Sequence, residues 1–225
     1  MSDPILTARG LTKRYSHRTA IAELDLTVGR GETWAVFGRN GAGKSTLIRL
    51  LSGLSVPTDG LVRIAGADPR RPGVRRRIGV VGHSTYLLGD LTAEENLLCW
   101  CNLYGLDRPK DRVGDWLGRV GLEDYRNERT SVLSRGQAQR LTLARALVPE
   151  PEILLLDEPF TGLDLSGAAL LREEIGKGGR TTIFATHDVE AGLALADHVL
   201  ALKAGRDVHS GESGTIGARE VAERL

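Results

Sequence analysis

The sequence predicts an α/β fold: a parallel-sheet core with an antiparallel β region at its N-terminal end and an inserted helical subdomain. Strand and helix patterns alternate at both ends of the 225-residue chain, whereas approximately residues 88–148 carry almost only helical patterns. In addition, a glycine-rich turn joins a predicted strand, Thr33–Phe37, to a predicted helix, Lys44–Leu54. We therefore expect residues 1–225 to form a single domain with residues 88–148 as its helical subdomain.

The part of the chain before the helical stretch predicts short strands. Ile5–Val28 alternates apolar and polar residues, which is typical of two half-buried strands, and a turn is expected near Ser16–Arg18. Leu61–Ala65 and Arg77–Val81 have the same strand character. These strands indicate that the N-terminal half of the core is rich in β structure.

The remaining elements follow from longer patterns. Helical patterns cover Thr92–Tyr104, Lys110–Val120 and Arg135–Leu147. Ile153–Leu156 and Thr181–Ala185 are continuous apolar runs, as buried parallel strands require. A helix follows each run, from Ser166 and from Val189, and a strand at Val199–Lys203 and a short C-terminal helix complete the prediction.

Composition limits the classes of function. Hydrophobic residues make up 41% and charged residues 26% of the chain, and the net charge is +1 with acids and bases interspersed. This balance predicts neither a basic face for nucleic acid nor a polybasic membrane anchor. The N-terminus lacks the features of a signal peptide, and no uncharged apolar run reaches the roughly 18 residues of a membrane helix. Cys99 and Cys101 are too close in sequence to favour a disulfide, which suits a reducing cytoplasm.

A phosphate-binding loop is the first candidate site. Residues 38–46, GRNGAGKST, fit the pattern G-x-x-x-x-G-K-[ST] between the predicted strand and helix. Glycines let backbone N–H groups turn toward phosphate oxygens, Lys44 adds a point charge, and Ser45 offers a hydroxyl to Mg²⁺. The alternative is a glycine turn without a ligand. The expected nucleotide contacts in this loop are Gly38, Asn40, Gly41, Gly43, Lys44, Ser45 and Thr46.

Two carboxylates follow the predicted strand Ile153–Leu156. Because ligands bind at the carboxyl ends of strands in open α/β sheets, Asp157 and Glu158 are expected near the phosphate loop. Asp157 is predicted to hold Mg²⁺ opposite Ser45, and Glu158 to orient and deprotonate a water for attack on the γ-phosphate. The alternative is a pair of acids that only caps a strand end.

Three further segments form an ordered set with the phosphate loop and the Asp157–Glu158 pair. They are LSRGQ (residues 133–137), TGLD (161–164) and THD (186–188). Together they resemble the ATP-binding subunits of ABC transporters, from about Ile5 to Gly211. LSRGQ is similar to the family's LSGGQ signature, although Arg135 replaces the family's commonest glycine. The alternative is a helix start capped by Ser134. The resemblance implies a P-loop NTPase core of the ABC ATPase type, with ATP and Mg²⁺ as its ligands.

The resemblance also assigns roles to residues outside the phosphate loop. It implies that His187 contacts the γ-phosphate and holds the attacking water with Glu158, and that Tyr15 stacks on adenine. Alternatives are a histidine that caps a helix and an aromatic residue of an edge strand. It further implies a homodimer in which each ATP uses Lys44 of one chain and the signature of the other. The residues implied on the signature side are Ser134, Gly136, Gln137 and, at the dimer seam, Asp164.

The stretch VVGHST, residues 80–85, indicates which subfamily of ABC transporters the chain resembles. Counting back from LTAEENL, residues 91–97, puts His83 where the family normally has a glutamine that touches Mg²⁺. With EPFTGLD and LALADHV, this is similar to the ATP-binding subunits of the cytochrome c biogenesis heme exporter, the CcmA type. We expect His83 to replace the glutamine as a hydrogen-bonding group, not to bind heme. The alternative is a loop histidine without a nucleotide role.

The resemblance implies integral membrane subunits as partners and a peripheral position at the cytoplasmic face of the inner membrane. Competing functions are an ATPase subunit of another ABC exporter, a mechanical ATPase acting on DNA or ribosomes, and a nucleotide-binding regulator that no longer hydrolyses ATP. A single phosphate loop, no heptad segment and no basic face argue against the second. No nucleic-acid partner is expected.

Overall fold

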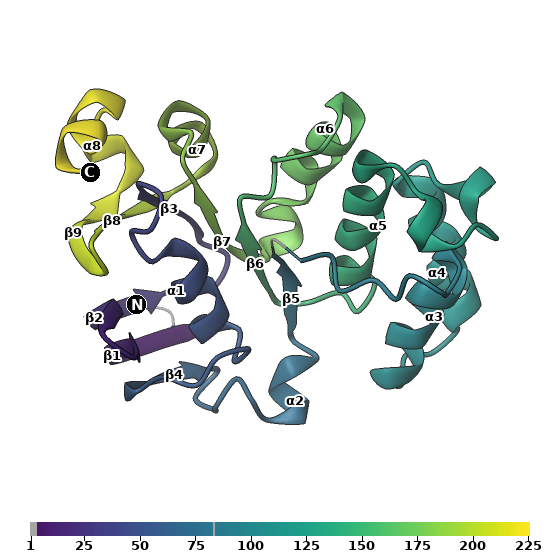
Figure 1. Ribbon diagram of the computed structural model, residues 1–225, viewed down its shortest axis with the longest axis horizontal. Coiled ribbons are helices and arrows are strands. Elements are labelled where there is room, and N and C mark those ends of the chain that lie inside the picture. The colour runs from purple at the N-terminus through teal and green to yellow at the C-terminus, as the bar shows by residue number, and fades with distance from the viewer. Residues whose placement is uncertain (1–3, 83) are drawn as a thin grey trace.

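The computed structural model describes residues 4–82 and 84–225 and contains two sheets (Figure 1). One has three antiparallel strands in the order β2-β1-β4, and the other has six strands in the order β5-β6-β7-β3-β8-β9. The predicted α/β fold with an antiparallel N-terminal region and an inserted helical segment is confirmed.

The antiparallel sheet is built from β1 (Leu6–Tyr15), β2 (Arg18–Val28) and β4 (Asp59–Ile64). β1 lies in the middle and pairs with both neighbours. The predicted turn between β1 and β2 is present, with Ser16 in the left-handed region at φ 47°. Alternation along these strands buries one set of apolar side chains and leaves charged residues outside, as the sequence pattern predicts.

The second sheet has a buried parallel core. β3 (Thr33–Gly38), β6 (Ile153–Asp157) and β7 (Thr181–Thr186) are buried at every residue, and β5 (Ile78–Val81) and β8 (His198–Lys203) flank them in parallel. An antiparallel edge strand, β9 (Arg206–Glu212), pairs with β8. The sequence does not predict β9, because RDVHSGE has one apolar side chain, Val208, and so lacks the apolar alternation of a half-buried strand.

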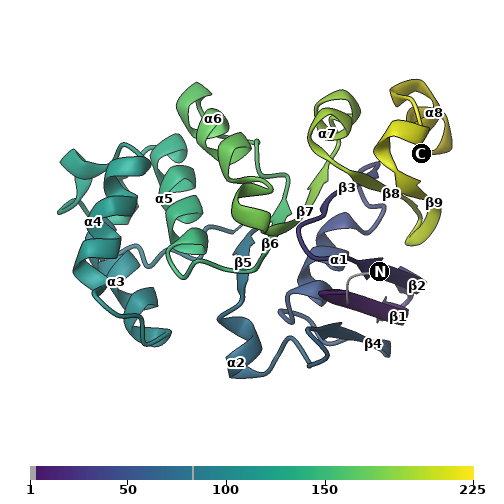
Figure 2. The ribbon, with the colours of Figure 1, turned by 180° about the vertical axis from the view of Figure 1, so that it is seen from behind.

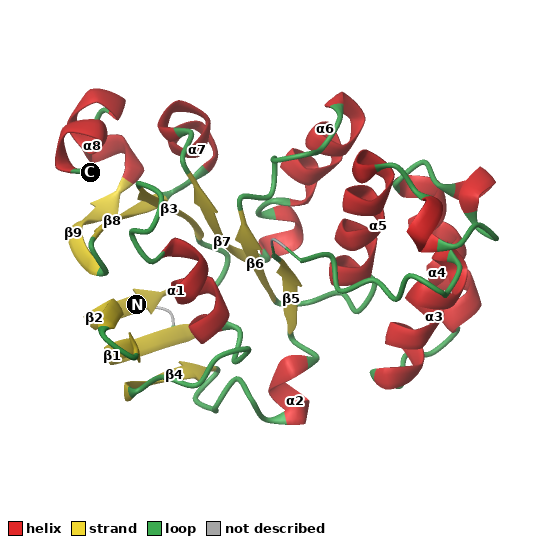
Figure 3. Ribbon diagram, in the orientation of Figure 1, coloured by secondary structure: helices red, strands yellow, loops and turns green. Residues whose placement is uncertain are grey.

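Helices cover both faces of this sheet (Figure 3). Alternate residues of β3 point into two separate cores: Trp34 and Val36 pack with α1 and the antiparallel sheet, and Ala35 and Phe37 pack on the opposite face. The helix predicted at Lys44–Leu54 already ends at Leu51, since Gly53 adopts φ 73°. The helices of the core are α1 (Lys44–Leu51), α2 (Pro72–Arg75), α6 (Leu165–Glu174), α7 (Val189–Leu195) and α8 (Ala218–Arg224).

The helices between β5 and β6 lie together beyond the β5 edge of the sheet, on the right in Figure 1 and on the left in Figure 2. They are α3 (Ala93–Leu103), α4 (Pro109–Arg119) and α5 (Arg135–Leu147), with 3-10 turns at Glu123–Tyr125 and Thr130–Val132. Two more 3-10 turns occur at Lys177–Gly179 and Ser213–Thr215. Within residues 4–82 and 84–225, no helix has the length and apolar character needed to cross a membrane.

Candidate functional site

The phosphate loop connects β3 directly to α1, as predicted. Gly41 and Gly43 adopt φ 82° and 113°, and a Cβ on Gly43 would lie 2.4 Å from the carbonyl oxygen of Ala20. A larger residue therefore does not fit at position 43, and the sequence forms this loop because glycine is present there. The loop borders a cavity of about 340 Å³ whose lining also includes Tyr15, Arg18 and Glu158.

Lys44 is the first residue of α1 and is buried, with 7% of its side chain exposed. Its Nζ donates a hydrogen bond to the carbonyl oxygen of Gly38 at 2.6 Å and lies 3.5 Å from Oε1 of Glu158. The ammonium group is thus held across the mouth of the loop, where a helix N-terminus already favours an anion.

Asp157 and Glu158 stand at the carboxyl end of β6. Asp157 is buried, and within the described part of the chain its Oδ1 has no hydrogen-bond partner. Glu158 has φ 49°, in the left-handed region, and its backbone N–H donates to the carbonyl oxygen of Ala185 at 2.9 Å. A non-glycine residue in this conformation costs free energy, so the surrounding structure holds the turn. The turn directs the Glu158 carboxylate toward Lys44.

His187 completes a line of contacts from three elements. It follows β7, has 71% of its side chain exposed, and places Nδ1 2.8 Å from Oε2 of Glu158. The helix cap that was the alternative role for this histidine is provided by Asp188, whose Oδ1 accepts the N–H of Ala191. Lys44, Glu158 and His187 therefore form one continuous set of polar contacts at the carboxyl edge of the sheet.

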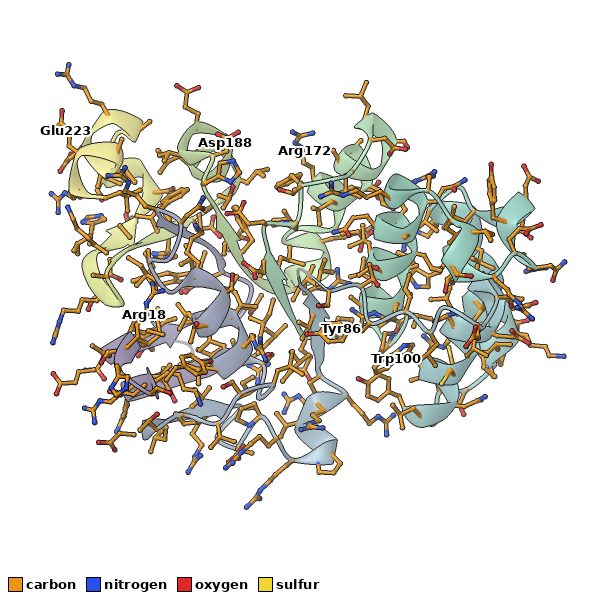
Figure 4. The ribbon with its side chains drawn as sticks, in the orientation of Figure 1. Arg18, Tyr86, Trp100, Arg172, Asp188 and Glu223 are labelled. Carbon is orange, nitrogen blue, oxygen red and sulfur yellow. The ribbon has the colours of Figure 1, made fainter. Side chains whose placement is uncertain are left out.

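Tyr15 and Arg18 bring the antiparallel sheet to the same cavity. Tyr15 ends β1 with 46% of its surface exposed, and Lys13 Nζ lies 5.0 Å from its ring centroid. Arg18, the first residue of β2 and labelled in Figure 4, donates from Nη2 to the carbonyl oxygen of Gly41 at 2.7 Å. Sequence reasoning missed Arg18. Its position directly after the turn that follows Tyr15 is the pattern that could have identified it.

The signature residues lie elsewhere. Ser134 caps α5, and its side chain and that of Gln137 exchange hydrogen bonds with each other's backbone in a capping box. Asp164 caps α6, and the hydrogen bond from the Gly167 N–H lowers the pKa of its carboxyl below the ordinary value. The carbonyl oxygen of Gly162 lies 3.8 Å from the position of a Cβ on Gly136, so the two loops are neighbours.

The phosphate loop and the signature are not brought together within one chain. Among the described residues, the lining of the loop cavity contains none of Ser134, Gly136, Gln137 and Asp164. Figure 1 shows β6 and β5 between α1 and α5, and Figure 2 agrees. One chain therefore presents two separate halves of the expected site.

The residues at the loop fit a magnesium ion shared with a nucleotide. No group of three or more His, Cys, Asp or Glu residues with the geometry to hold a metal occurs in residues 4–82 and 84–225. Magnesium bound with phosphates needs only one or two protein oxygens, however. The unpartnered Oδ1 of Asp157 and the exposed Ser45 at the start of α1 are such oxygens. The predicted role of His83 concerns a residue outside the described ranges.

Comparisons with known proteins agree with this geometry. The model of the family described as ABC transporter matches residues 21–161. The ABC transporter ATP-binding protein NatA of Bacillus subtilis (strain 168) is 36% identical over 98% of this chain and 95% of its own length. The daunorubicin resistance ATP-binding protein DrrA3 of Streptomyces coeruleorubidus is 37% identical over 100% of this chain and 73% of its own.

Solved structures give the same result. The dimeric post-hydrolysis ATP-binding cassette MJ0796, bound to ADP and Pi, superposes with a TM-score of 0.84 and 28% identity, covering 92% of this chain and 98% of that one. The cbiO1 protein of Clostridium perfringens, part of the complex cbiONQ, superposes with a TM-score of 0.80 and 32% identity, covering 99% and 94%.

Proposed function

Because the chain belongs to the ABC transporter family, in which it is an ATP-hydrolysing subunit, we propose that two copies close around two ATP molecules and drive a membrane exporter. The observation that carries the proposal is the line Lys44–Glu158–His187 at the mouth of the phosphate loop. A phosphate-binding cation forms an ion pair with a carboxylate, and the carboxylate is hydrogen-bonded to an imidazole.

Each of these side chains has a distinct part in hydrolysis. The loop N–H groups and Lys44 bind the phosphates and hold the γ-phosphate in position. Glu158 accepts the proton of the attacking water, and His187, in contact with Glu158 Oε2, keeps the carboxylate and the water aligned. Binding of a γ-phosphate competes for Lys44 and so releases Oε1 of Glu158 for the water. Mg²⁺, held by Asp157 and Ser45 when bound, supplies positive charge for the phosphate oxygens. Tyr15 offers its exposed ring for stacking on adenine.

A second copy of the chain supplies the missing half of the site. In the proposed homodimer, Ser134, Gly136 and Gln137 at the start of α5 contact the γ-phosphate held by the partner, and Asp164 lies at the seam. The separation of the two halves within one chain supports this arrangement, and the similar cassette MJ0796 is itself dimeric.

Gel filtration of the Glu158→Gln variant tests the dimer. Without the base, bound ATP persists and we expect an ATP-dependent dimer, while the double variant Lys44→Ala/Glu158→Gln stays monomeric under the same conditions. A Glu158→Gln chain that remains monomeric at saturating Mg-ATP would count against the proposal.

We further propose that the transporter is the heme exporter of cytochrome c biogenesis. The support is the segment pattern around His83, LTAEENL, EPFTGLD and LALADHV. Some of these residues also serve the fold: Asn96 donates to the carbonyl oxygens of Leu88, Leu91 and Thr92 and so holds the start of α3. Relatives of 34 to 37% identity carry names as different as daunorubicin resistance and Nod factor export. An ATPase subunit of another ABC exporter is therefore the second candidate.

The proposal includes integral membrane subunits and a peripheral position at the cytoplasmic face of the inner membrane. In it, residues 1–225 form one ABC domain, and the helical subdomain 88–148 faces the membrane subunit. Purification of the chain from its native membrane in mild detergent tests the assignment. We expect c-type cytochrome assembly proteins to co-purify, and recovery with an unrelated permease would reject the heme exporter.

A further inference from the structure

A cluster of arginines surrounds the short helix α2. Residues 63–77 contain six arginines and a single acid, Asp68, although the whole chain has a net charge of only +1. The balanced composition predicts no basic face, whereas the structure has a local excess of positive charge around α2. The excess arises because the acids that balance these arginines in the whole chain lie elsewhere in the fold. Local concentration of charge, not the total, decides what a surface attracts.

Only part of this charge is neutralised within the chain. Arg70 forms a bidentate pair with Asp68, and Arg77 forms one with Glu152. Arg71, Arg75 and Arg76 are exposed and take part in no ion pair or side-chain hydrogen bond within the described residues. They stand at the N-cap, the last residue and the C-cap of α2, so three free cations are displayed on one turn of helix.

An exposed apolar side chain lies beside these cations. Leu54, in the loop after α1, is 46% exposed. Leu54 lines one cavity together with Arg75, and the position of a Cβ on Gly53 is 3.1 Å from the backbone nitrogen of Arg70. We call Arg71, Arg75, Arg76 and Leu54 the α2 face. In Figures 1 and 2, α2 lies at the lower edge of the molecule, on the side away from α6, α7 and α8.

We propose that the α2 face binds the surface of a membrane that contains anionic phospholipids. The cations attract the headgroups, and Leu54 enters the boundary between headgroups and acyl chains. A nucleic acid would use the charges but leave Leu54 in water. Cytoplasmic loops of membrane proteins carry an excess of Lys and Arg, so their charge has the same sign as the α2 face. The inference rests on the proposed membrane role of the chain and adds a direct lipid contact to it.

Vesicle flotation of the purified chain tests the contact without any membrane subunit. The probes are phosphatidylcholine vesicles with and without about one third phosphatidylglycerol, since the attraction depends on anionic lipid. Each arginine near such a surface contributes roughly fivefold to partitioning, so the triple variant Arg71→Gln/Arg75→Gln/Arg76→Gln is expected to bind on the order of a hundredfold less. High salt should weaken binding of the unaltered chain in the same direction.

A control variant carries the same charge change at a distance from α2. Arg129, Arg172 and Arg206 are exposed and form no side-chain hydrogen bond or ion pair among the described residues. Their replacement by Gln should leave binding to phosphatidylglycerol vesicles within about twofold, because the local field at α2 is unchanged. Circular dichroism of both triple variants checks that they are folded.

Three results would overturn the inference: no preference of the unaltered chain for phosphatidylglycerol, equal binding by the α2 variant and the control, or tighter binding to duplex DNA than to the vesicles at the same salt concentration. ATP hydrolysis by the same preparations is measured separately. A chain that binds vesicles without hydrolysing ATP contradicts the proposed function but supports the lipid contact. A chain that hydrolyses ATP without binding vesicles contradicts the lipid contact but supports the proposed function.

Discussion

Carboxylates stand at both ends of strand β6: Glu152 directly before it, and Asp157 and Glu158 at its carboxyl end. The carboxylates at the two ends differ in how many hydrogen-bond partners they have. At the amino end, Glu152 accepts hydrogen bonds from Arg77 Nε at 2.5 Å and Nη2 at 2.7 Å, and from Arg30 at 3.2 Å. At the carboxyl end, Oδ1 of Asp157 has no partner among the described residues, and Glu158 faces Lys44 across 3.5 Å. One end is saturated with partners and the other is not.

Glu174, at the end of α6, extends the saturated region. It is 1% exposed and pairs with Arg119 of α4, with Lys177 at 3.0 Å and with Arg180 at 3.1 Å. Burial alone would raise the pKa of this carboxyl, but hydrogen bonds from Lys177 and Arg180, together with Arg119, outweigh it and lower the pKa. Arg119 thereby connects the helical segment to the core.

The difference separates residues that hold the fold from residues that await a ligand. Buried polar groups in native proteins are almost always hydrogen-bonded, so a buried oxygen without a partner indicates that something outside the chain completes it. The amino end of β6 has no such atom among its described carboxylates, whereas the carboxyl end has one beside the phosphate loop. Substitutions at the carboxyl end of β6 should therefore change ATP hydrolysis, and substitutions in the saturated region should change the free energy of unfolding.

The largest effect is expected at the carboxyl end. Glu158→Gln removes the base and should slow ATP hydrolysis by roughly a hundredfold to ten-thousandfold, the usual contribution of a general base. A phosphate-release assay measures this loss, and urea unfolding should show little change in stability. Comparable loss of activity in the matched variant Glu152→Gln would remove the distinction between the two ends.

The next effect is expected in the saturated region. Glu174→Ala leaves the cations around a buried site without their anion and should lower the free energy of unfolding by about 3–5 kcal/mol. Urea denaturation measures it, and the control is Glu173→Ala, whose side chain is 62% exposed. A cost similar to that of the control would mean that the network does not hold α4 and α6 together.

A smaller effect is expected from acid. The pKa of Glu174 is lowered in the folded chain from its ordinary value of 4.5, so the folded state binds protons less readily than the unfolded state. This stabilisation is complete above pH 4.5 and is lost as the pH falls through the lower, folded value. The urea midpoint of the unaltered chain should therefore fall in this window. The midpoint of Glu174→Gln should fall less, and parallel curves would contradict the assignment.

Much of the fold could be predicted because its elements have strong local patterns. Ile153–Leu156 and Thr181–Ala185 are unbroken apolar runs, and both are buried parallel strands. The sequence pattern does not predict β9 and α2, because Val208 is the one apolar side chain of β9 and α2 has only four residues. β9 is a strand because it pairs with the preceding strand β8 across a tight turn, with Lys203 opposite Arg206.

The candidate site was predictable in its residues but not in its contacts. Lys44, Glu158 and His187 come from motifs, whereas the order Lys44–Glu158–His187 depends on the parallel arrangement of β3, β6 and β7. The contact of Arg18 with Gly41 requires the β1–β2 turn to reach the loop. The arginine run 70–77 is visible in the sequence, but its free charges and its apolar neighbours are apparent only in three dimensions.

Mixing two inactive variants tests the central claim, hydrolysis at a site shared by two copies, most directly. Lys44→Ala and Ser134→Ala should each abolish most hydrolysis alone, because every site in either dimer lacks one half. In a mixed dimer, one site combines the intact Lys44 of one copy with the intact Ser134 of the other. Equal mixing should therefore restore roughly a quarter of the sites, as symmetric pairing predicts. A mixture that stays as inactive as its components would contradict the shared site.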